Sequence, residues 1–327
     1  MDDIKGEFGL SKKTVGDKGL KYDREDIKVT SMLLMCILTV MVCAVSIISI
    51  YEEKSLLDLI HDVASEAEAI MTDGKSEMVK IEDETVPLAD GKDTQPNLKA
   101  KRNSYDLSNL YEDEYYRYYF EGDERASKVG IDVSYYQGKI DWKKVKKSGV
   151  DFAIIRLGYR GYLEGELALD KKYKYNIKHA KKNGIDVGVY FFTQAITEKE
   201  AIEEAKYCLK YVKGHDLEYP IVIDTEAINA DNVRSQKTKL NKDELTKVCK
   251  AFCDTINDAG YESAIYASKS WFFNRLNLEK LDGYNKWLAH YTKITDYKYD
   301  FDIWQYSSDG KVPGIKGRVD VNIGFDK

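Results

Sequence analysis

From Lys128 to the end of the chain, strand-like apolar runs alternate with amphipathic helical segments, and this alternation limits the possible folds more than any other feature. The strand-like runs are residues 129–134, 152–159, 186–193, 220–226, 262–268, 285–291, 301–307 and 319–325. Helical segments separate the first five runs, whereas helices largely vanish after Trp271. Alternating strands and helices predict parallel strands under helical cover, and eight such strands can close into a ring. We therefore expect an α/β barrel.

The helical segments carry sequence signals at their ends. Polar residues typical of helix starts precede four of them: Asp141, Asp170, Thr197 and Asn241. Thr197 with Glu200, and Asn241 with Glu244, have the spacing of a capping box. Glycines at positions 149, 184 and 260 end three of the segments. These signals predict helices between the first five strands.

The run from Tyr219 to Glu226 stops abruptly on two carboxylates. Three β-branched residues, 221–223, predict a buried strand. Because side chains alternate along a strand with a rise of about 3.3 Å per residue, Asp224 and Glu226 point the same way, with backbones roughly 6.5 Å apart. Acids at strand ends are also often solvated or cap the next helix, so this run alone leaves both interpretations open.

In barrels of this kind, functional residues lie at the C-terminal ends of the strands. The residues expected there from the other runs are Asp132, Arg156, Tyr159, Tyr190, Phe192, Tyr266, Trp287, Tyr291, Trp304, Gln305, Tyr306, Asp320 and Asn322. Carboxylates transfer protons and stabilise cations, and flat rings pack on sugar faces, so this combination favours a glycosidase. Alternatives stay open for six of these residues: Asp132 as the cap of a turn with Ser134, Asp320 as a link between its strand and a neighbour, Arg156 as a structural partner of the acids, and Tyr190, Tyr266 and Trp287 as core aromatics.

Other chemistries lack their residues. The chain has four histidines, and none has metal-ligand spacing, so we expect no metal. No serine or cysteine lies in a nucleophile elbow, no glycine-rich phosphate loop follows a strand, and no basic stripe suits nucleic acid. We therefore expect no cofactor and no nucleic-acid partner. Cys208, Cys249 and Cys253 are interpreted as small buried apolar residues, and their redox state does not follow from the sequence.

Residues 31–50 contain no charged side chain, and twenty residues in a helix span about 30 Å, the thickness of one hydrocarbon core. This run predicts a single transmembrane helix. Basic residues precede it and acidic residues follow it: Lys21, Arg24, Lys28, Glu52 and Glu53. The bias predicts a cytoplasmic N-terminus and an extracellular C-terminal part. A cleaved signal peptide ending near residues 44–46 is the alternative.

Residues 51–126 carry nine basic and twenty acidic residues, whereas residues 127–327 carry 34 and 29. Apolar residues in 51–80 follow heptad spacing and predict a helical stalk, either a weak homodimeric coiled coil or a single amphipathic helix. The acidic, proline-containing stretch 81–126 predicts a flexible, largely disordered linker. Its last part is rich in tyrosine, and docking of this part on the C-terminal module is the alternative.

Four motifs in order resemble glycoside hydrolase family 25. They are Asp132 to Gly138 followed by Ile140 to Trp142, Ile223 to Glu226, Ile303 to Ser308, and Val319 to Asn322. The resemblance covers residues 128–327 and nothing before them. It implies an irregular TIM-like (β/α)5(β)3 barrel and a lysozyme that cuts the β-1,4 bond between N-acetylmuramic acid and N-acetylglucosamine in peptidoglycan.

The resemblance also implies roles for the acids. Glu226 would be the general acid, Asp224 would orient or stabilise the reacting sugar through its 2-acetamido group, and Asp132 and Asp320 would complete the acidic cluster. Neighbouring negative charge and partial burial raise a carboxyl pKa, which would keep Glu226 protonated before reaction. The nucleophile stays open between a carboxylate and the acetamide of the substrate.

The sequence thus predicts five parts: a cytoplasmic segment (1–30), a transmembrane helix (31–50), a helical stalk (51–80), an acidic linker (81–126) and a catalytic barrel (127–327). We expect a membrane-tethered peptidoglycan hydrolase that remodels nearby cell wall. A non-catalytic module that binds wall glycan, and a glycosidase for another amino-sugar polymer, are the alternatives.

Overall fold

The computed structural model of the protein describes residues 78–81, 96, 98–228, 233–234 and 240–326. The predicted cytoplasmic segment, the predicted transmembrane helix and nearly all of the predicted stalk lie outside these residues. Within the described ranges, no helix is both long enough and apolar enough to cross a membrane.

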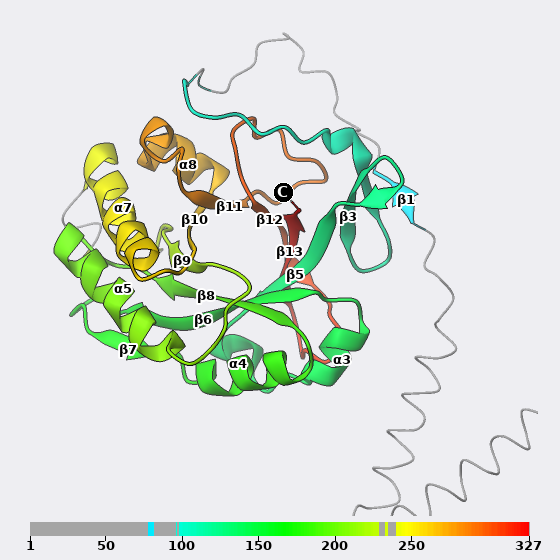
Figure 1. The fold of residues 1–327 in the computed structure, drawn as a ribbon, viewed down its shortest axis with the longest axis horizontal. Coiled ribbons are helices and arrows are strands. Elements are labelled where there is room, and N and C mark those ends of the chain that lie inside the picture. Colours follow the sequence, from blue (N-terminus) through cyan, green and yellow to red (C-terminus); the bar gives the residue numbers. More distant parts are fainter. Residues whose placement is uncertain (1–77, 82–95, 97, 229–232, 235–239, 327) are drawn as a thin grey trace, which may run out of the picture. The chain divides into compact units, whose positions relative to one another are not determined.

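Eight strands form a closed barrel (Figure 1). They are β5 (Ser127–Val133), β6 (Phe152–Arg160), β8 (Asp186–Phe192), β9 (Ile221–Asp224), β10 (Ser263–Ser268), β11 (Asn285–Ala289), β12 (Ile303–Gly310) and β13 (Val319–Phe325). Their order is β5-β13-β12-β11-β10-β9-β8-β6, and β5 also pairs with β6, which closes the ring. β13 pairs antiparallel with both of its neighbours, and the other barrel pairs are parallel. All eight predicted strands are confirmed to within a few residues.

Helices cover the outside of the barrel after each of its first five strands (Figure 1). They are α3 (Trp142–Lys147), α4 (Tyr173–Lys182), α5 (Glu198–Val212), α7 (Lys242–Asp258) and α8 (Lys269–Arg275). Short 3-10 turns, η2 (Tyr135–Gln137) and η3 (Leu278–Lys280), and the edge strand β7 (Leu167–Leu169) complete the module. Five strand–helix units followed by three strands make a mixed α/β fold that is not a regular eightfold barrel.

The helix starts agree with the sequence signals in part. Asn241 and Glu244 form the predicted capping box of α7. Thr197 accepts a hydrogen bond from the backbone N–H of Glu200, but the Glu200 carboxylate accepts from Ile196, so the box at α5 is incomplete. Asp170 is not the N-cap residue of α4, but its Oδ1 atom accepts from the backbone N–H of Lys172, which is.

Residues 98–126, here called the extension, are packed against the barrel, so the prediction of a flexible linker is wrong for this part. The extension contains η1 (Leu107–Asn109), β2 (Leu110–Glu112), β3 (Arg117–Glu121) and β4 (Glu124–Arg125). These strands form a small sheet with β1 (Val79–Lys80), two residues that the sequence assigned to the helical stalk. Figure 1 shows β3 running beside β5 and β13.

Aromatic side chains attach the extension to the barrel. The ring of Tyr105 stacks on Phe325 with centroids 4.1 Å apart, and its hydroxyl donates to the carbonyl of Phe301. Tyr119 is buried and contacts the same Phe325 ring. Each ring buries much apolar area, which offsets the acidic composition of the segment. The alternative interpretation, docking of the tyrosine-rich stretch, therefore describes the extension.

A small inner core fills the barrel and forms the floor of its mouth. Phe152 stacks on Tyr219 at one level, with centroids 4.1 Å apart. A Cβ atom at Gly130 would lie 2.1 Å from the Phe152 ring, so only glycine fits there. Tyr266 and Trp287 belong to the same core and meet edge to face, with centroids 4.6 Å apart. Their polar ends are thus held on a packed support.

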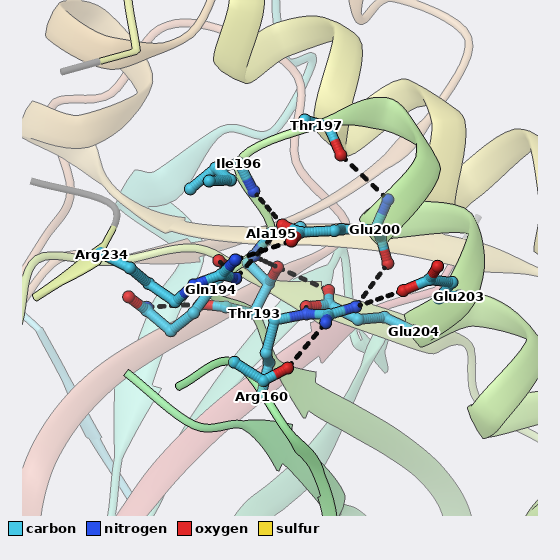
Figure 2. A network of polar contacts seen from close by, with 11 residues as sticks. Arg160, Thr193, Gln194, Ala195, Ile196, Thr197, Glu200, Glu203, Glu204 and Arg234 are labelled. Carbon is cyan, nitrogen blue, oxygen red and sulfur yellow. Dashed lines mark hydrogen bonds and ion pairs between the residues drawn. The ribbon is translucent and has the colours of Figure 1, made fainter. Parts of the chain in front are cut away.

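A buried polar network joins the end of β6, the segment after β8 and helix α5 (Figure 2). The Arg160 Nε donates to Glu204 Oε1 at 2.7 Å, and the Thr193 hydroxyl donates to Glu204 Oε2 at 2.6 Å. Arg160 also donates to the carbonyl of Glu200. Arg234, from the segment after β9, pairs with the Glu200 carboxylate at 2.7 Å. The network therefore fixes two loops at the mouth of the barrel.

Removing the buried carboxylate of this network should destabilise the fold. Glu204→Ala removes the buried ionic partner of the Arg160 guanidinium, and we expect the free energy of unfolding to fall by about 3–5 kcal/mol. Glu203→Ala is the matched control, because Glu203 contacts the same guanidinium at 3.4 Å but its side chain is 46% exposed. That variant should lose less than about 1 kcal/mol. Equal losses in urea denaturation would contradict the role of Glu204.

Candidate active site

The predicted acids converge at the mouth of the barrel. Strand β9 ends at Asp224, and Glu226 follows two residues later. Both acids line one cavity of about 180 Å3, together with Asp132 and Asp320. Asp224 and Asp132 are each 6% exposed, whereas Glu226 lies at the opening and is exposed as a whole residue. Four carboxyl groups from three strand ends therefore share one small space.

Strand register places two of these acids side by side. In the antiparallel pair of β5 and β13, Asp132 lies directly opposite Asp320. Directly opposed residues project their side chains to the same face. Asn322 lies two residues after Asp320 and so projects to that face as well.

Two amide side chains hold the Asp132 carboxylate. Its Oδ2 atom accepts a hydrogen bond from Gln305 Nε2 and another from Asn322 Nδ2, both at 2.8 Å. Gln305 is 2% exposed and Asn322 is fully buried. Asp132 therefore has a fixed orientation before any substrate arrives.

Aromatic side chains hold the two amides in turn. The hydroxyls of Tyr266 and Tyr291 both donate to Gln305 Oε1 at 2.8 Å. The Trp287 Nε1 donates to Asn322 Oδ1 at 2.8 Å. Tyr266 and Trp287 line the cavity and also belong to the inner core, so both interpretations of these residues hold. The same is true of Tyr190, which lines the cavity and meets Trp287 edge to face.

The sequence places Tyr291 and Asn322 at the mouth of the barrel, but it assigns neither residue a role in the site. Asn322 had a usable signal, because it stands in the Val319 to Asn322 motif at even spacing from Asp320. Tyr291 ends the sixth strand-like run, but a lone tyrosine there carries no signal for a hydrogen bond to Gln305.

Burial and mutual repulsion raise the carboxyl pKa values of the cluster. Burial raises the pKa of Asp132 well above its usual range, and the charge of Asp320 adds to this effect. Burial, then the charge of Glu226, likewise raises the pKa of Asp224, and burial raises that of Asp320 to about 6. Partial loss of solvation, and then the charge of Asp320, raise the pKa of the Glu226 carboxyl. The cluster therefore favours keeping protons on some of its carboxyls near neutral pH.

Arg156 reaches the site but forms its ion pair outside the acidic cluster. Its Nε donates to Asp170 Oδ2 at 2.8 Å, and Asp170 is 2% exposed and also accepts from the backbone N–H of Tyr135. Arg156 lines a second cavity of about 350 Å3 that includes Tyr136 and the four acids. The ring centroid of Tyr159 lies 5.7 Å from the guanidinium carbon of Arg156. Tyr159 is not among the described residues that line these cavities.

Glu226 also borders a third, larger cavity of about 470 Å3. Trp271 and Leu240 supply apolar surface there, and Arg275 supplies a charge. The Trp271 Nε1 donates to Thr225, the residue between Asp224 and Glu226. Glu226 thus stands where three cavities meet, as expected of an acid beside a polymeric ligand.

No group of three or more histidine, cysteine or acidic side chains in the described part of the chain has the geometry of a metal site. Cys208, Cys249 and Cys253 are buried and free, and burial raises the pKa of each thiol. A raised pKa makes a thiol a poor nucleophile. The chemistry available at the mouth is therefore that of carboxyl groups.

Comparison with known proteins agrees with this site. Residues 131–315 match the profile of Glycosyl hydrolases family 25. The chain belongs to this family. It is similar to the solved modular autolysin LytC from Streptococcus pneumoniae, at 32% identity and a TM-score of 0.55, covering 70% of this chain and 53% of LytC. A family 25 glycosyl hydrolase from Bacillus anthracis has the same fold, at 20% identity and a TM-score of 0.52, covering 66% and 95%.

Among curated sequences, the autolytic lysozyme of Clostridium acetobutylicum is 26% identical over 194 residues, which cover 59% of this chain and 54% of that protein. The chain thus spans about half the length of LytC and of the autolytic lysozyme. As a family 25 member, the protein is a glycoside hydrolase. The extension precedes the residues that match the family profile.

The charge of Asp320 should set the pH range in which this family 25 hydrolase works. Asp320→Asn removes a negative charge that raises the pKa of Glu226, so that pKa falls. A general acid with a lower pKa loses its proton at lower pH, and the alkaline limb of the activity profile should move to lower pH. The measurement is kcat/KM against pH, with Asp123→Asn, an exposed acid in a turn, as control. An unmoved limb would contradict the coupling.

Proposed function

We propose that this chain hydrolyses peptidoglycan at the β-1,4 bond between N-acetylmuramic acid and N-acetylglucosamine, with Glu226 as the general acid. The observation that carries the proposal is the convergence of Glu226, Asp224, Asp132 and Asp320 on one cavity in a family 25 barrel. The relatives support the substrate class, since one is named an autolytic lysozyme and LytC has been solved with a synthetic peptidoglycan ligand.

Glu226 would protonate the oxygen of the departing sugar. Its position at the meeting point of three cavities lets a glycan chain pass on both sides of the acid. Its raised pKa keeps the proton in place until the bond needs it. After cleavage, the ionised carboxylate can take a proton from the attacking water.

Asp224 would hold the reacting sugar. Its Oδ1 atom is buried and has no hydrogen-bond partner among the described residues. A buried polar atom without a partner is costly, and a ligand that donates a hydrogen bond removes that cost. The N–H of a 2-acetamido group is such a donor, so Asp224 would either orient this acetamide as the nucleophile or stabilise the positive charge on the ring.

Asp132 and Asp320 would act through charge. Asp132 is fixed by Gln305 and Asn322, so in its ionised form its negative field at the reacting carbon is preorganised. Such a field stabilises the oxocarbenium-like transition state of glycoside hydrolysis. Asp320 adds to that field and raises the pKa of Glu226.

We further propose that residues 31–50 anchor the chain in the cell membrane, with residues 1–30 in the cytoplasm and the barrel outside. The uncharged run and the basic residues before it support this topology. An anchored hydrolase would cut only wall close to the membrane, which suits local remodelling. A weak homodimer through residues 51–80 rests on heptad spacing alone.

Substitution of the general acid should remove turnover while leaving the fold intact. In Glu226→Gln the amide is isosteric but cannot give up a proton, so release of reducing ends from purified peptidoglycan should fall by about 10²–10⁴-fold. Glu262→Gln, an exposed glutamate elsewhere, should keep wild-type activity. Mass spectrometry should find N-acetylmuramic acid at the new reducing ends.

Three other outcomes separate the alternatives. Equal activity in Glu226→Gln would exclude this acid as the proton donor. Binding of wall glycan by the wild type without any release would indicate a non-catalytic module. Different sugars at the new ends would indicate another amino-sugar polymer as substrate.

A further inference from the structure

A groove lies between the extension and the rim of the barrel. One wall is residues 112–117, which form the end of β2, the turn and the start of β3. The other wall is formed by Tyr291, Thr292 and residues 306–309. The groove encloses about 460 Å3, within the usual range of about 300–1,000 Å3 for ligand pockets. Its first wall precedes the residues that match the family profile.

This groove borders the catalytic cavity. Tyr291 lines both spaces. Its hydroxyl donates to Gln305, the residue that holds Asp132. The catalytic cavity and the groove therefore adjoin at Tyr291.

The extension wall is held rigidly on the barrel. Arg117 donates to the carbonyls of Thr292 and Lys293, at 2.6 and 2.9 Å, and its guanidinium lies 4.6 Å from the ring centroid of Tyr306. The backbone N–H of Arg117 donates to the Tyr306 hydroxyl. Asp113 accepts from the N–H groups of the two residues that follow Glu114, which fixes the turn. The groove is therefore formed before a ligand binds.

We propose that this groove is an additional sugar subsite, which takes an uncharged N-acetylhexosamine unit of the same glycan strand beyond the catalytic cavity. The inference rests on the proposed function. Tyr115 and Tyr291, 47% and 56% exposed, offer ring faces to a sugar.

The charge of the groove selects this occupant over the peptide stems of the wall. Four carboxylates and one guanidinium line it: Glu112, Asp113, Glu114 and Asp309, and Arg117. Arg117 pairs with Glu112, and Arg318, outside the lining, lies 3.6 Å from Asp309, so the carboxylates still outnumber the guanidinium groups. Carboxylates accept hydrogen bonds from sugar hydroxyls, whereas this excess of negative charge repels the carboxylates of a peptide stem. A segment absent from the family profile thus lengthens the glycan-binding surface.

The test is a series of peptide-free glycans of the same repeat, with four, six and eight sugars, cut by the full-length chain. For the wild type we expect kcat/KM to rise about five- to tenfold from four to eight sugars, because longer chains reach the subsite. Tyr115→Ala should abolish this rise and keep the wild-type value on the shortest glycan. Tyr162→Ala, a tyrosine of similar exposure (46%) that does not line the groove, should keep the rise.

Several results would overturn the proposal. An intact rise in Tyr115→Ala would show that the groove binds no sugar. An equal loss at every length would assign Tyr115 a structural role. Purified peptidoglycan serves as the peptide-bearing comparison: an intact rise on the glycans with slower cutting of peptidoglycan in Tyr115→Ala would assign the groove to the peptide stem. If the wild type cuts neither these glycans nor purified peptidoglycan, the proposed function itself fails, which is a separate result.

Discussion

The site depends on the way in which the last strand closes the barrel. Strand β13 enters antiparallel between β12 and β5, and its register with β5 sets Asp320 opposite Asp132. A shift of one residue would turn Asp320 and Asn322 to the other face of the sheet. Asp132 would then lose one of its two amide partners, and Glu226 would lose the neighbouring charge that raises its pKa. The closing pair therefore sets both geometry and electrostatics.

At the mouth of the barrel, one buried carboxyl group is held by hydrogen bonds and another has an oxygen without a hydrogen-bond partner among the described residues. Asp132 is held by two amides that aromatic side chains orient, and such a complete network is rigid. Asp224, equally buried, keeps one oxygen without a partner. Ion clusters and orphaned polar atoms destabilise a fold, and they persist where function needs them. The proposed position of the substrate is therefore beside this oxygen of Asp224.

Periodicity and end signals in the sequence predicted the barrel well, because they report local constraints. All eight strands and the capping box of α7 follow from spacing that a single segment carries by itself. The convergence of the four acids followed from strand ends and from the family motifs. Asp170 was assigned to a helix start, and its Oδ1 atom does accept from the Lys172 backbone N–H there, but its Oδ2 atom also pairs with Arg156, which the local sequence does not predict.

For the extension, amino-acid composition gave the wrong prediction, that of a flexible linker. Its many acidic residues are typical of disordered segments, yet its tyrosines bury enough apolar surface on Phe301 and Phe325 to order it. Which surface those rings would find depends on residues about 200 positions later, and no local pattern contains that information. The bond from Tyr291 to Gln305 escaped prediction for the same reason.

The central claim is that convergence of acids lets Glu226 hold a proton above the pH at which an ordinary glutamate loses it. NMR titration of the Glu226 carboxyl carbon in the glutamate-labelled wild type tests this most directly, with the signal assigned by its absence from the Glu226→Gln spectrum. We predict a pKa above the ordinary value of about 4.3. A pKa at or below that value would contradict the account.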